Sequence, residues 1–592
     1  MTHPLIPLRD IRFMLFDWLK ADRLYGKAPF EEHSRETAEA VLNLAEQLAV
    51  DCFLPHYKQA DQQEPQLGPD GVRALPAIGE ALAQYAEAGL SAASFPAQYG
   101  GMDLPYHVHA AMFSLFAAAN IATSAYTMLS SANARLITHF GNAAQIEQFA
   151  SPQIEGRWFG TMCLSEPQAG SSLADVRTRA AFDGEDELGR RYRLVGNKMW
   201  ISGGDHDLAE NIVHLVLAKI PNADGSLTEG TKGLSLFIVP KVQPDGMRND
   251  VVVAGLNHKM GYRGTVNCLL NFGEKTGALG WIVGEPGQGL RQMFSMMNEA
   301  RISVGIGAAA LGYRGYRHAA VYAGERLQGR PAGIRTGVQV PIIEHVDVRR
   351  MLLAQKAYVE GALALCLFCA QLIDEQGHIE SSELLSLLTP VAKTWSSEYG
   401  LAANDLAIQV HGGYGYTRDF DVEQLYRDNR LNPIHEGTTG IQAADLLARK
   451  LLAEHPPGWS TLQKRIAQCL QAAAGDPRLA QHATQLQLVW DAIAAALTVL
   501  RDEPVERVLD NSVSFLRAFG HSVLAWIWLE QAVAAASTAA AGQDDEVFRA
   551  GKLQACRYFF DYEVPQIEAW LAPVIAGSRA AASAAPDIFL LT

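Results

Sequence analysis

Hydrophobic residues recur at every third or fourth position through the first part of the chain, from about Thr37 to Gly156. Two examples are RETAEAVLNLAEQLAV (35–50) and ALPAIGEALAQYAEAGL (74–90). This spacing places the apolar side chains on one face of a helix. The first part of the chain is therefore predicted to be helical.

The pattern changes between about Phe159 and Val283. Short runs rich in β-branched residues appear, separated by turn-rich stretches such as PNADGSLTEGTKG. The runs are YRLVGNKMWIS, IVHLVLAKI, GLSLFIVPKV, VVVAGL and NCLLNF. Runs of this length and composition predict a compact all-β domain.

Long stretches with helical spacing return after about Gly287, beginning at Leu290, Val346 and Leu384. They are long enough for a helical bundle. The segment HPPGW (455–459) is a predicted linker, and an alanine-rich helical region follows it.

The predicted fold class is α+β and multidomain, with four regions in the order helical, β, helical and helical. The expected domains are an N-terminal helical domain 1–158 with an N-terminal extension 1–36, a β domain 159–283, a helical bundle 284–455 and an additional C-terminal helical domain 460–592.

Composition narrows the functional classes. The chain has 592 residues, 48% of them hydrophobic, and a net charge of −15. An acidic balance argues against non-specific nucleic-acid binding.

The N-terminus lacks a signal-peptide pattern. The segment VLAWIWLEQAVAAASTAAAG (523–542) carries Glu530 and Gln531, so we expect a buried or amphipathic helix and no membrane span.

Cysteine usage indicates a reducing compartment. The seven cysteines are sparse and odd in number, which is untypical of a disulfide framework. Cys366 and Cys369 lie in the apolar stretch ALALCLFCAQLI, where we interpret them as core thiols on one helix face. No metal-ligand set with a known spacing is present, and we expect no metal.

Two segments of the β region could hold a flat ligand. In TMCLSEPQAGSSLADVRTRA (161–180), small residues would let a ligand approach backbone N–H groups, although a plain loop explains them equally. In KMWIS (198–202), Trp200 and Ser202 share one face of a strand. An indole and a hydroxyl there could contact a planar heterocycle, but Trp200 could also belong to the core.

Two segments of the helical region carry charged candidates. Asn298 and Arg301 lie on an apolar helix, where a structural ion pair is the alternative explanation. Glu436 lies in HEGTTG, between an apolar run and a Gly-Thr turn. A desolvated carboxylate there could act as a base, or it could be an acidic residue at the entry of the next helix.

Taken together, these segments resemble the acyl-CoA dehydrogenase family over about residues 40–450. TMCLSEPQAGSSLADVRTRA is similar to its N-terminal flavin-loop signature, and KMWIS to its flavin-contacting strand. QVHGGYGYTRDFDVEQLYRD followed by HEGTTGIQ is similar to its C-terminal signature. The chain length, PLRDIRFMLFDWL and IIEHVDVRRMLL resemble a large bacterial subfamily that carries an added C-terminal helical domain.

The resemblance implies a role for each matching residue. Glu436 matches the catalytic base. The residues that match FAD contacts are Met162, Leu164, Ser165, Ser171, Trp200, Ser202, Arg326, Gln328, Gln409, Gly412, Gly413 and Thr438. The residues that match the substrate site are Ser171, Asn298, Arg301 and Gly437. Of the FAD contacts, Arg326, Gln328, Gln409, Gly412 and Gly413 match residues that reach the FAD of a neighbouring subunit.

The implied reaction is FAD-dependent α,β-dehydrogenation of an acyl-CoA to a trans-2-enoyl-CoA in fatty-acid β-oxidation, with flavin N5 as the hydride acceptor. Backbone N–H of Glu436 and a flavin hydroxyl would polarise the thioester carbonyl. The implied partners are an electron-transfer flavoprotein and further copies of the chain, as a homodimer or a dimer of dimers with FAD near the interface. The implied location is the bacterial cytoplasm.

Three alternatives stay open at this point. The acyl group could be a straight fatty chain or the methylthio chain of 3-methylmercaptopropionyl-CoA, from dimethylsulfoniopropionate breakdown. The electron acceptor could be oxygen, as in an acyl-CoA oxidase. The protein could also be a non-catalytic scaffold of the same fold.

The chain departs from the family pattern at three places. His435 replaces a frequent tyrosine, and Gly440 stands where many members have a polar FAD contact. The segment GERLQGR lacks an aromatic residue that is common before its second glycine.

Overall fold

The chain divides into two compact units. The N-terminal unit contains Tyr25–Ser303, and the C-terminal unit combines Met1–Leu24 with Val304–Thr592. The first residues of the chain therefore fold with its last half. The computed structural model describes residues 4–375, 377–537 and 542–590, without the side chains of 295–298.

Helices form the first part of the N-terminal unit. They are α2 (Arg35–Leu48), α3 (Tyr57–Gln62), α4 (Pro76–Glu87), α5 (Tyr106–Phe140), α6 (Ala143–Gln145) and α7 (Ser151–Ile154). Ser34 caps α2, because its hydroxyl accepts from the Thr37 N–H at 3.2 Å while its own N–H donates to the Thr37 hydroxyl at 2.8 Å. The predicted helical character between Thr37 and Gly156 is confirmed except at residues 66–73, which form a short hairpin.

A closed set of strands follows in the same unit. The strands are β3 (Trp158–Cys163), β4 (Arg179–Asp186), β5 (Gly189–Ser202), β6 (Asn211–Lys219), β7 (Leu234–Pro240), β8 (Val251–Leu256), β9 (Asn267–Phe272) and β10 (Ala278–Ile282). The order β10-β7-β6-β4-β5 returns to β10, which also pairs with β5, so the strands close into a barrel. Every residue of β6 and β7 is buried, as in a strand covered on both faces.

The five predicted strands are confirmed as β5 to β9. The sequence patterns did not indicate β4 or β10, nor the short hairpin of β1 (Gln66–Gly68) and β2 (Gly71–Arg73). Strand β4 reads RAAFDGED and is largely exposed, so it lacks the apolar alternation that marks a half-buried strand. Strand β10 has only five residues, ALGWI, with glycine at its centre.

The long helices of the bundle are also confirmed. They are α8 (Gly289–Glu325), α9 (Val346–Asp374) and α10 (Ile379–His411), followed by the shorter α11 (Val422–Asn429) and α12 (Thr439–Ala444). Cys366 and Cys369 are free and fully buried on α9, which confirms their interpretation as core thiols.

The added C-terminal region is helical, as predicted. Its helices are α13 (Trp459–Ala474), α14 (Ala480–Arg501), α15 (Val505–Asp510), α16 (Ser512–Ser537), α17 (Gln543–Tyr558) and α18 (Gln566–Ile575). Helix α16 covers most of the segment predicted as a buried or amphipathic helix, of which 538–541 lie outside the described residues, and the structure decides for burial, since Trp526 and Trp528 have no exposed surface. Its Glu530 accepts hydrogen bonds from the indoles of Trp18 and Trp526, at 3.0 and 2.8 Å, and burial raises its pKa.

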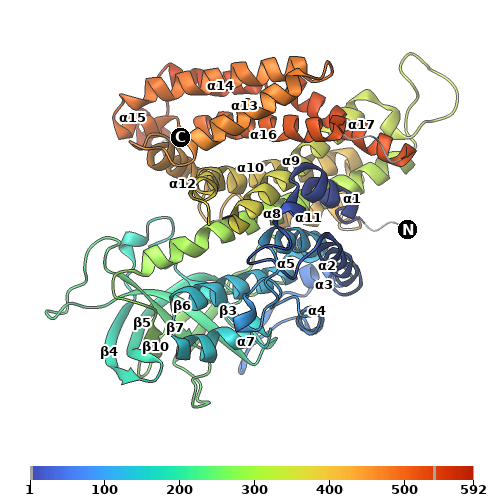
Figure 1. Ribbon diagram of the computed structural model, residues 1–592. Coiled ribbons are helices and arrows are strands. Elements are labelled where there is room, and N and C mark those ends of the chain that lie inside the picture. The colour runs from blue at the N-terminus through green and yellow to red at the C-terminus, as the bar shows by residue number, and fades with distance from the viewer. Residues whose placement is uncertain (1–3, 376, 538–541, 591–592) are drawn as a thin grey trace. The chain divides into compact units, whose positions relative to one another are not determined.

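The N-terminal segment packs beside this region. Figure 1 shows α1 (Leu8–Arg12) next to α17. The Lys552 ammonium on α17 contacts Asp10 of α1 at 2.5 Å and Glu360 of α9 at 2.8 Å, and all three side chains are buried. The Tyr313 hydroxyl also donates to Asp10, at 2.9 Å. Paired charges of this kind tie three distant segments together.

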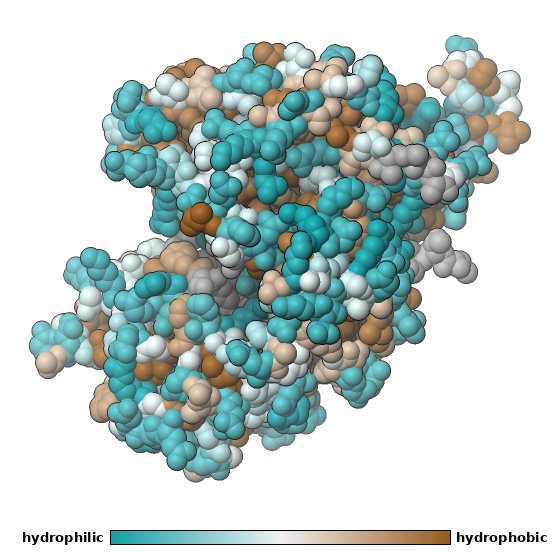
Figure 2. All heavy atoms as spheres, in the orientation of Figure 1, coloured by the Kyte–Doolittle hydropathy of each residue, from teal (hydrophilic) through white to brown (hydrophobic). Residues whose placement is uncertain are grey.

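Within the part of the chain that the structure describes, three helices are long and apolar enough by composition to cross a membrane, namely α5, α9 and α14. The apolar windows of α5 and α9 are 94% and 83% buried inside the protein, whereas that of α14 is 39% buried. On the face in Figure 2, hydrophilic side chains predominate and hydrophobic ones are scattered among them. Burial of α5 and α9 explains their apolar composition without a membrane.

Candidate active site

The loop after β3 carries the first group of predicted residues. A tight turn links Glu166 and Ala169, whose backbone groups exchange hydrogen bonds of 2.9 and 3.0 Å. Met162, Leu164 and Ser165 are half-buried, while Ser171 is exposed. A Cβ atom on Gly170 would meet nothing within 4 Å, so the loop leaves open space on that side.

A buried carboxylate organises this loop. Glu166 accepts from the backbone N–H groups of Arg177 and Thr178 at 2.8 and 3.0 Å. The Lys198 ammonium on β5 lies 3.0 Å from Glu166 and also donates to the Leu164 carbonyl at 2.9 Å. Burial raises the pKa of Glu166, but Lys198 and the other donors outweigh it and lower that pKa overall. Both ends of the loop are thus fixed to one ion pair.

Trp200 and Ser202 lie at the end of β5, beside the same loop. The pairing of β5 with β9 shifts between Lys198 and Ile201, and Trp200 has a left-handed φ of +63°. Its side chain is 59% exposed, which rules out the core alternative. The Ser202 hydroxyl accepts from the Asn267 amide at 3.1 Å, and the Met199 N–H donates to the Ser165 carbonyl at 3.1 Å.

This group fits the flavin that the sequence resemblance implies. A side chain as large and apolar as tryptophan is rarely this exposed. The face of its indole can stack on a planar ring. The end of β5 that carries Trp200 and Ser202 is bonded to the loop of Ser165 through the Met199 N–H, and the Lys198 ammonium binds the Leu164 carbonyl of the same loop. The structure therefore brings six predicted FAD contacts into one region of the N-terminal unit.

Two predicted substrate residues lie on α8. Arg301 is buried, with 5% of its surface exposed. Asn298 belongs to the same helix, and its side chain lies outside the described residues.

Glu436 lies in the connection between α11 and α12. Its φ is +52° and that of Gly437 is +90°, so two successive residues adopt the left-handed region. The Glu436 carbonyl accepts from the Gln442 amide at 3.0 Å, and the Gly437 carbonyl accepts from the Lys393 ammonium at 2.7 Å. The φ of +90° strains any residue other than glycine, and a Cβ atom on Gly437 would also lie 2.6 Å from the Gln442 side-chain nitrogen, so that the side chain would have to move.

The alternative role of Glu436 as a helix-entry acid is not supported. Helix α12 begins at Thr439, its N-cap is Thr438, and its first turn contains no acidic residue. The Thr439 hydroxyl donates instead to Glu398 of α10 at 2.9 Å. The carboxylate of Glu436 thus belongs to the turn and not to the helix.

His435 is neutral at physiological pH. Its Nε2 lies 3.1 Å from the Asn432 side-chain oxygen. Burial, with a smaller contribution from the Lys393 charge, lowers the pKa of His435 to about 3. The substitution of histidine for the usual tyrosine therefore adds no charge beside Glu436.

The remaining predicted FAD contacts form another group on the C-terminal unit. Arg326 follows the end of α8, and its guanidinium lies 5.9 Å from the ring centre of Tyr414. The Gln328 N–H donates to the Val340 carbonyl at 3.0 Å, which closes the base of the loop that follows α8. Gln409, Gly412 and Gly413 are exposed at the end of α10 and just beyond it.

Sequence reasoning missed the residues that support these groups, namely Lys198, Lys393, Asn267 and Gln442. Lys393 is a single charged residue in the apolar stretch LLSLLTPVAKTW, and a lone lysine in such a stretch is a signal that could have identified it. Lys198 lies in the predicted strand YRLVGNKMWIS, which also contains Arg193, so the sequence did not distinguish it.

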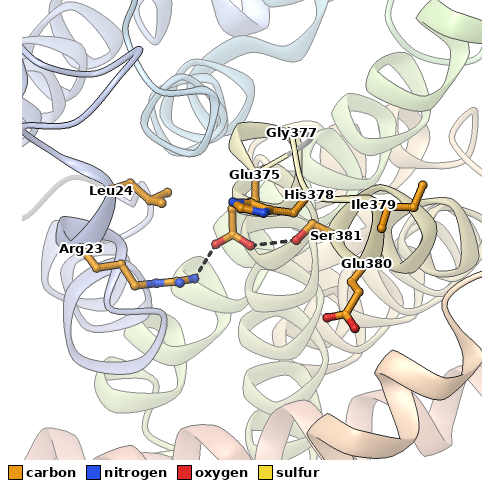
Figure 3. Close-up of a pocket in the computed structure, with 8 residues that line it drawn as sticks. All are labelled: Arg23, Leu24, Glu375, Gly377, His378, Ile379, Glu380 and Ser381. Atoms are coloured by element: carbon orange, nitrogen blue, oxygen red, sulfur yellow. Dashed lines mark hydrogen bonds and ion pairs between the residues drawn. The ribbon is translucent and has the colours of Figure 1, made fainter.

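A surface pocket of about 530 Å³ lies elsewhere in the C-terminal unit. Figure 3 shows the Glu375 carboxylate between Arg23 and the Ser381 hydroxyl, which donates to it at 3.1 Å. The lining includes none of the predicted site residues. Among the side chains that the structure describes, no three His, Cys, Asp or Glu residues are grouped so that they could hold a metal ion.

Domain models of known protein families match nearly the whole chain. Residues 35–157, 161–274 and 287–452 match the N-terminal, middle and C-terminal domains of acyl-CoA dehydrogenases, and 462–585 match the acetyl-CoA dehydrogenase C-terminal-like domain.

Similar proteins of nearly the same length include three named enzymes. The 3-methylmercaptopropionyl-CoA dehydrogenase of Ruegeria pomeroyi is 34% identical, over 92% of this chain and 93% of that protein. The broad-specificity linear acyl-CoA dehydrogenase FadE5 of Mycobacterium tuberculosis is 32% identical over 94% and 95%. A butyryl-CoA dehydrogenase of Syntrophomonas wolfei is 30% identical over 95% of each chain.

A solved structure shares the fold. The acyl-CoA dehydrogenase of Bacillus anthracis, crystallised with FAD, superposes with a TM-score of 0.75 at 22% identity and covers 92% of this chain and 89% of its own. The four matched domains and the full-length relatives confirm the α+β multidomain fold expected from the sequence. The chain therefore belongs to the acyl-CoA dehydrogenase family of FAD-dependent oxidoreductases, within its long form that carries an added C-terminal helical domain.

Proposed function

We propose that the protein converts an acyl-CoA to its trans-2-enoyl-CoA, with Glu436 as the base that takes the α-proton. Bound FAD supplies the acceptor for the β-hydride. The observation that carries the proposal is the backbone of Glu436. A non-glycine residue in the left-handed region costs roughly 1–3 kcal/mol, and such strain concentrates at functional sites.

The surroundings of Glu436 support this role. The carbonyls of Glu436 and Gly437 are both held by buried side chains, so the turn has a defined shape before substrate binds. A base that is already oriented avoids part of the entropic cost of reaching its proton. Neutral His435 next to it does not compete for that proton.

The Glu436→Gln variant tests the base. We expect FAD and acyl-CoA to bind while flavin reduction under anaerobic conditions slows by at least about 10²-fold, the usual contribution of a general base. Turnover at the wild-type rate would contradict the assignment. Hydrogen peroxide released in air at the rate of substrate consumption would instead identify an oxidase.

We also propose that the substrate is a linear acyl-CoA used in β-oxidation. The broad-specificity and butyryl-CoA relatives favour this class, and the Ruegeria relative makes 3-methylmercaptopropionyl-CoA the second candidate. Anaerobic bleaching of the flavin across straight-chain acyl-CoAs of increasing length and 3-methylmercaptopropionyl-CoA separates the two. Bleaching by the methylthio substrate alone would refute the first candidate.

We propose further that the protein works in the cytoplasm as a homodimer or a dimer of dimers and passes electrons to an electron-transfer flavoprotein. The exposed group around Arg326 and Gln409 supports the assembly, because Tyr414 and Tyr416 beside it are 51% and 89% exposed. Aromatic residues exposed in this way are typical of subunit contacts. Sedimentation velocity at several concentrations tests the assembly, and a monomer at all of them would refute it.

A further inference from the structure

Lys393 is a buried lysine that the proposed reaction does not use directly. It lies on α10 and has no exposed surface. Its neighbours on the helix are also buried, including Val391, Ala392, Thr394 and Trp395. Removing an ammonium group from water is costly unless specific partners replace the solvent. Burying Lys393 therefore lowers the stability of the folded protein unless its partners compensate for the lost solvent.

The ammonium is directed at the turn that carries Glu436. It donates to the Gly437 carbonyl at 2.7 Å, the length of a strong charge-assisted hydrogen bond. The Gln442 amide holds the adjacent Glu436 carbonyl at 3.0 Å, and Gln442 is also fully buried. These two contacts come from different helices, α10 and α12, and fix two successive peptide groups.

The Glu436–Gly437 turn, which Lys393 and Gln442 hold, is also strained. Glu436 and Gly437 have φ values of +52° and +90°, and a residue other than glycine relaxes from such a conformation unless its surroundings prevent it. The Glu436 and Gly437 carbonyls belong to the peptide groups on either side of the Gly437 Cα, so holding both carbonyls fixes the orientation of both peptide planes. The orientation of these planes in turn sets the direction in which the Glu436 side chain leaves the backbone.

The positive charge of Lys393 also reaches this turn, since it contributes to the lowered pKa of His435. Lys393 therefore acts on this turn through its charge as well as through its hydrogen bond.

We infer that Lys393 is a positioning residue for proton abstraction, which holds the Glu436–Gly437 turn so that the carboxylate meets the substrate α-carbon. The inference rests on the proposed role of Glu436 as the base. Lys393 itself exchanges no proton with the substrate.

The test measures proton abstraction separately from the redox step. An acyl-CoA with sulfur in place of the β-carbon has an acidic α-proton but no β-hydride to give. With the FAD-loaded enzyme in D₂O, exchange of its α-protons is followed by mass spectrometry. In Lys393→Met, which keeps the volume and removes the donor, we expect exchange to slow by about 10²-fold, the scale for a misplaced catalytic group. FAD content and the Kd for the analogue should change less than about threefold, well within one tenfold step of affinity.

A second lysine provides the matched control. Lys450 donates at 2.7 Å to the Ser386 hydroxyl on the same helix α10, about two helical turns before Lys393. Lys450→Met should exchange α-protons at the wild-type rate. If Lys393→Met does not fold, Lys393→Leu also removes both the charge and the donor, with the same expected loss. Lys393→Arg keeps the charge and the donor and should restore part of the exchange.

The outcomes separate the two proposals. Wild-type exchange in Glu436→Gln would overturn Glu436 as the base. Wild-type exchange in folded Lys393→Met or Lys393→Leu, together with lost exchange in Glu436→Gln, would overturn the positioning role alone. Equal losses of exchange, FAD content and analogue affinity in Lys393→Met would show a general structural role and would also overturn the inference.

Discussion

The Lys198 ammonium lies 3.0 Å from the Glu166 carboxylate, and their side chains are 0% and 3% exposed. This ion pair joins strand β5, which carries Trp200, to the loop that carries Ser165 and Ser171. Two separate segments that match flavin contacts in the family are thus held by one buried interaction.

Replacing Lys198 should weaken FAD binding. Lys198→Met leaves a buried carboxylate without its cation, a change that typically costs about 3–5 kcal/mol. We expect the loop to loosen and the Kd for FAD to rise by at least about tenfold, equivalent to 1.4 kcal/mol. Titration of the apoprotein with FAD, followed by flavin fluorescence, measures this change. Arg190→Met on the same strand removes an exposed pair with Glu285 and should leave the Kd unchanged.

A methyl group on Gly437 should impair catalysis more than folding. Gly437→Ala places a Cβ atom 2.6 Å from the Gln442 amide nitrogen at a φ of +90°. The turn must shift, and a misplacement of about 1 Å can reduce a rate by about 10²-fold. Stopped-flow flavin reduction should show this loss while FAD content is retained. Gly475→Ala, where the nearest atom would lie 3.6 Å away, serves as the control. An unchanged reduction rate in Gly437→Ala would contradict the importance of this turn.

Lys552 should contribute to stability and not to catalysis. Lys552→Met leaves Asp10 and Glu360 buried beside each other with one fewer cation. Breaking a buried pair in this way costs about 3–5 kcal/mol in the free energy of unfolding. Urea unfolding monitored by circular dichroism checks this value. Lys464→Met removes an exposed pair with Glu380 and should cost no more than about 1 kcal/mol. Equal stabilities of the two variants would show that the buried cluster does not anchor the N-terminal segment.

His206 should make the N-terminal unit sensitive to acid. Burial, with a smaller effect of Lys241, lowers the pKa of His206 to about 3. Its pKa in the unfolded chain is about 6.5, so the unfolded state binds an extra proton between these values and stability falls as the pH falls. The loss between pH 7.5 and pH 5 should be about 2 kcal/mol for this group. His206→Gln should remove about that much of the pH dependence, as measured by urea unfolding at both pH values. An unchanged pH dependence would show that His206 is protonated in the folded state.

Much of the fold could be predicted because it leaves a local trace in the sequence. Helices α8, α9 and α10 follow long stretches of three- and four-residue spacing, and β5 to β9 follow short apolar runs. Strand β4 could not be predicted, because most of its residues face solvent and carry no alternating pattern. Exposure of Trp200 could not be predicted either, since the bulge that turns its side chain outward depends on the pairing of β5 with β9.

The sequence by itself determined the order of helical, β and helical regions, the helical nature of α16 and the segments that match the flavin loop and the Glu436 turn. Local periodicity and short contiguous motifs are sufficient for these. Only the tertiary structure decided that Met1–Leu24 packs with the last helices, and that Lys198, Lys393 and Gln442 hold the two key loops. These contacts join residues far apart in the chain, and the sequence does not distinguish a buried lysine from an exposed one. Its role depends on which partners replace water around its charge, and folding alone brings those partners together.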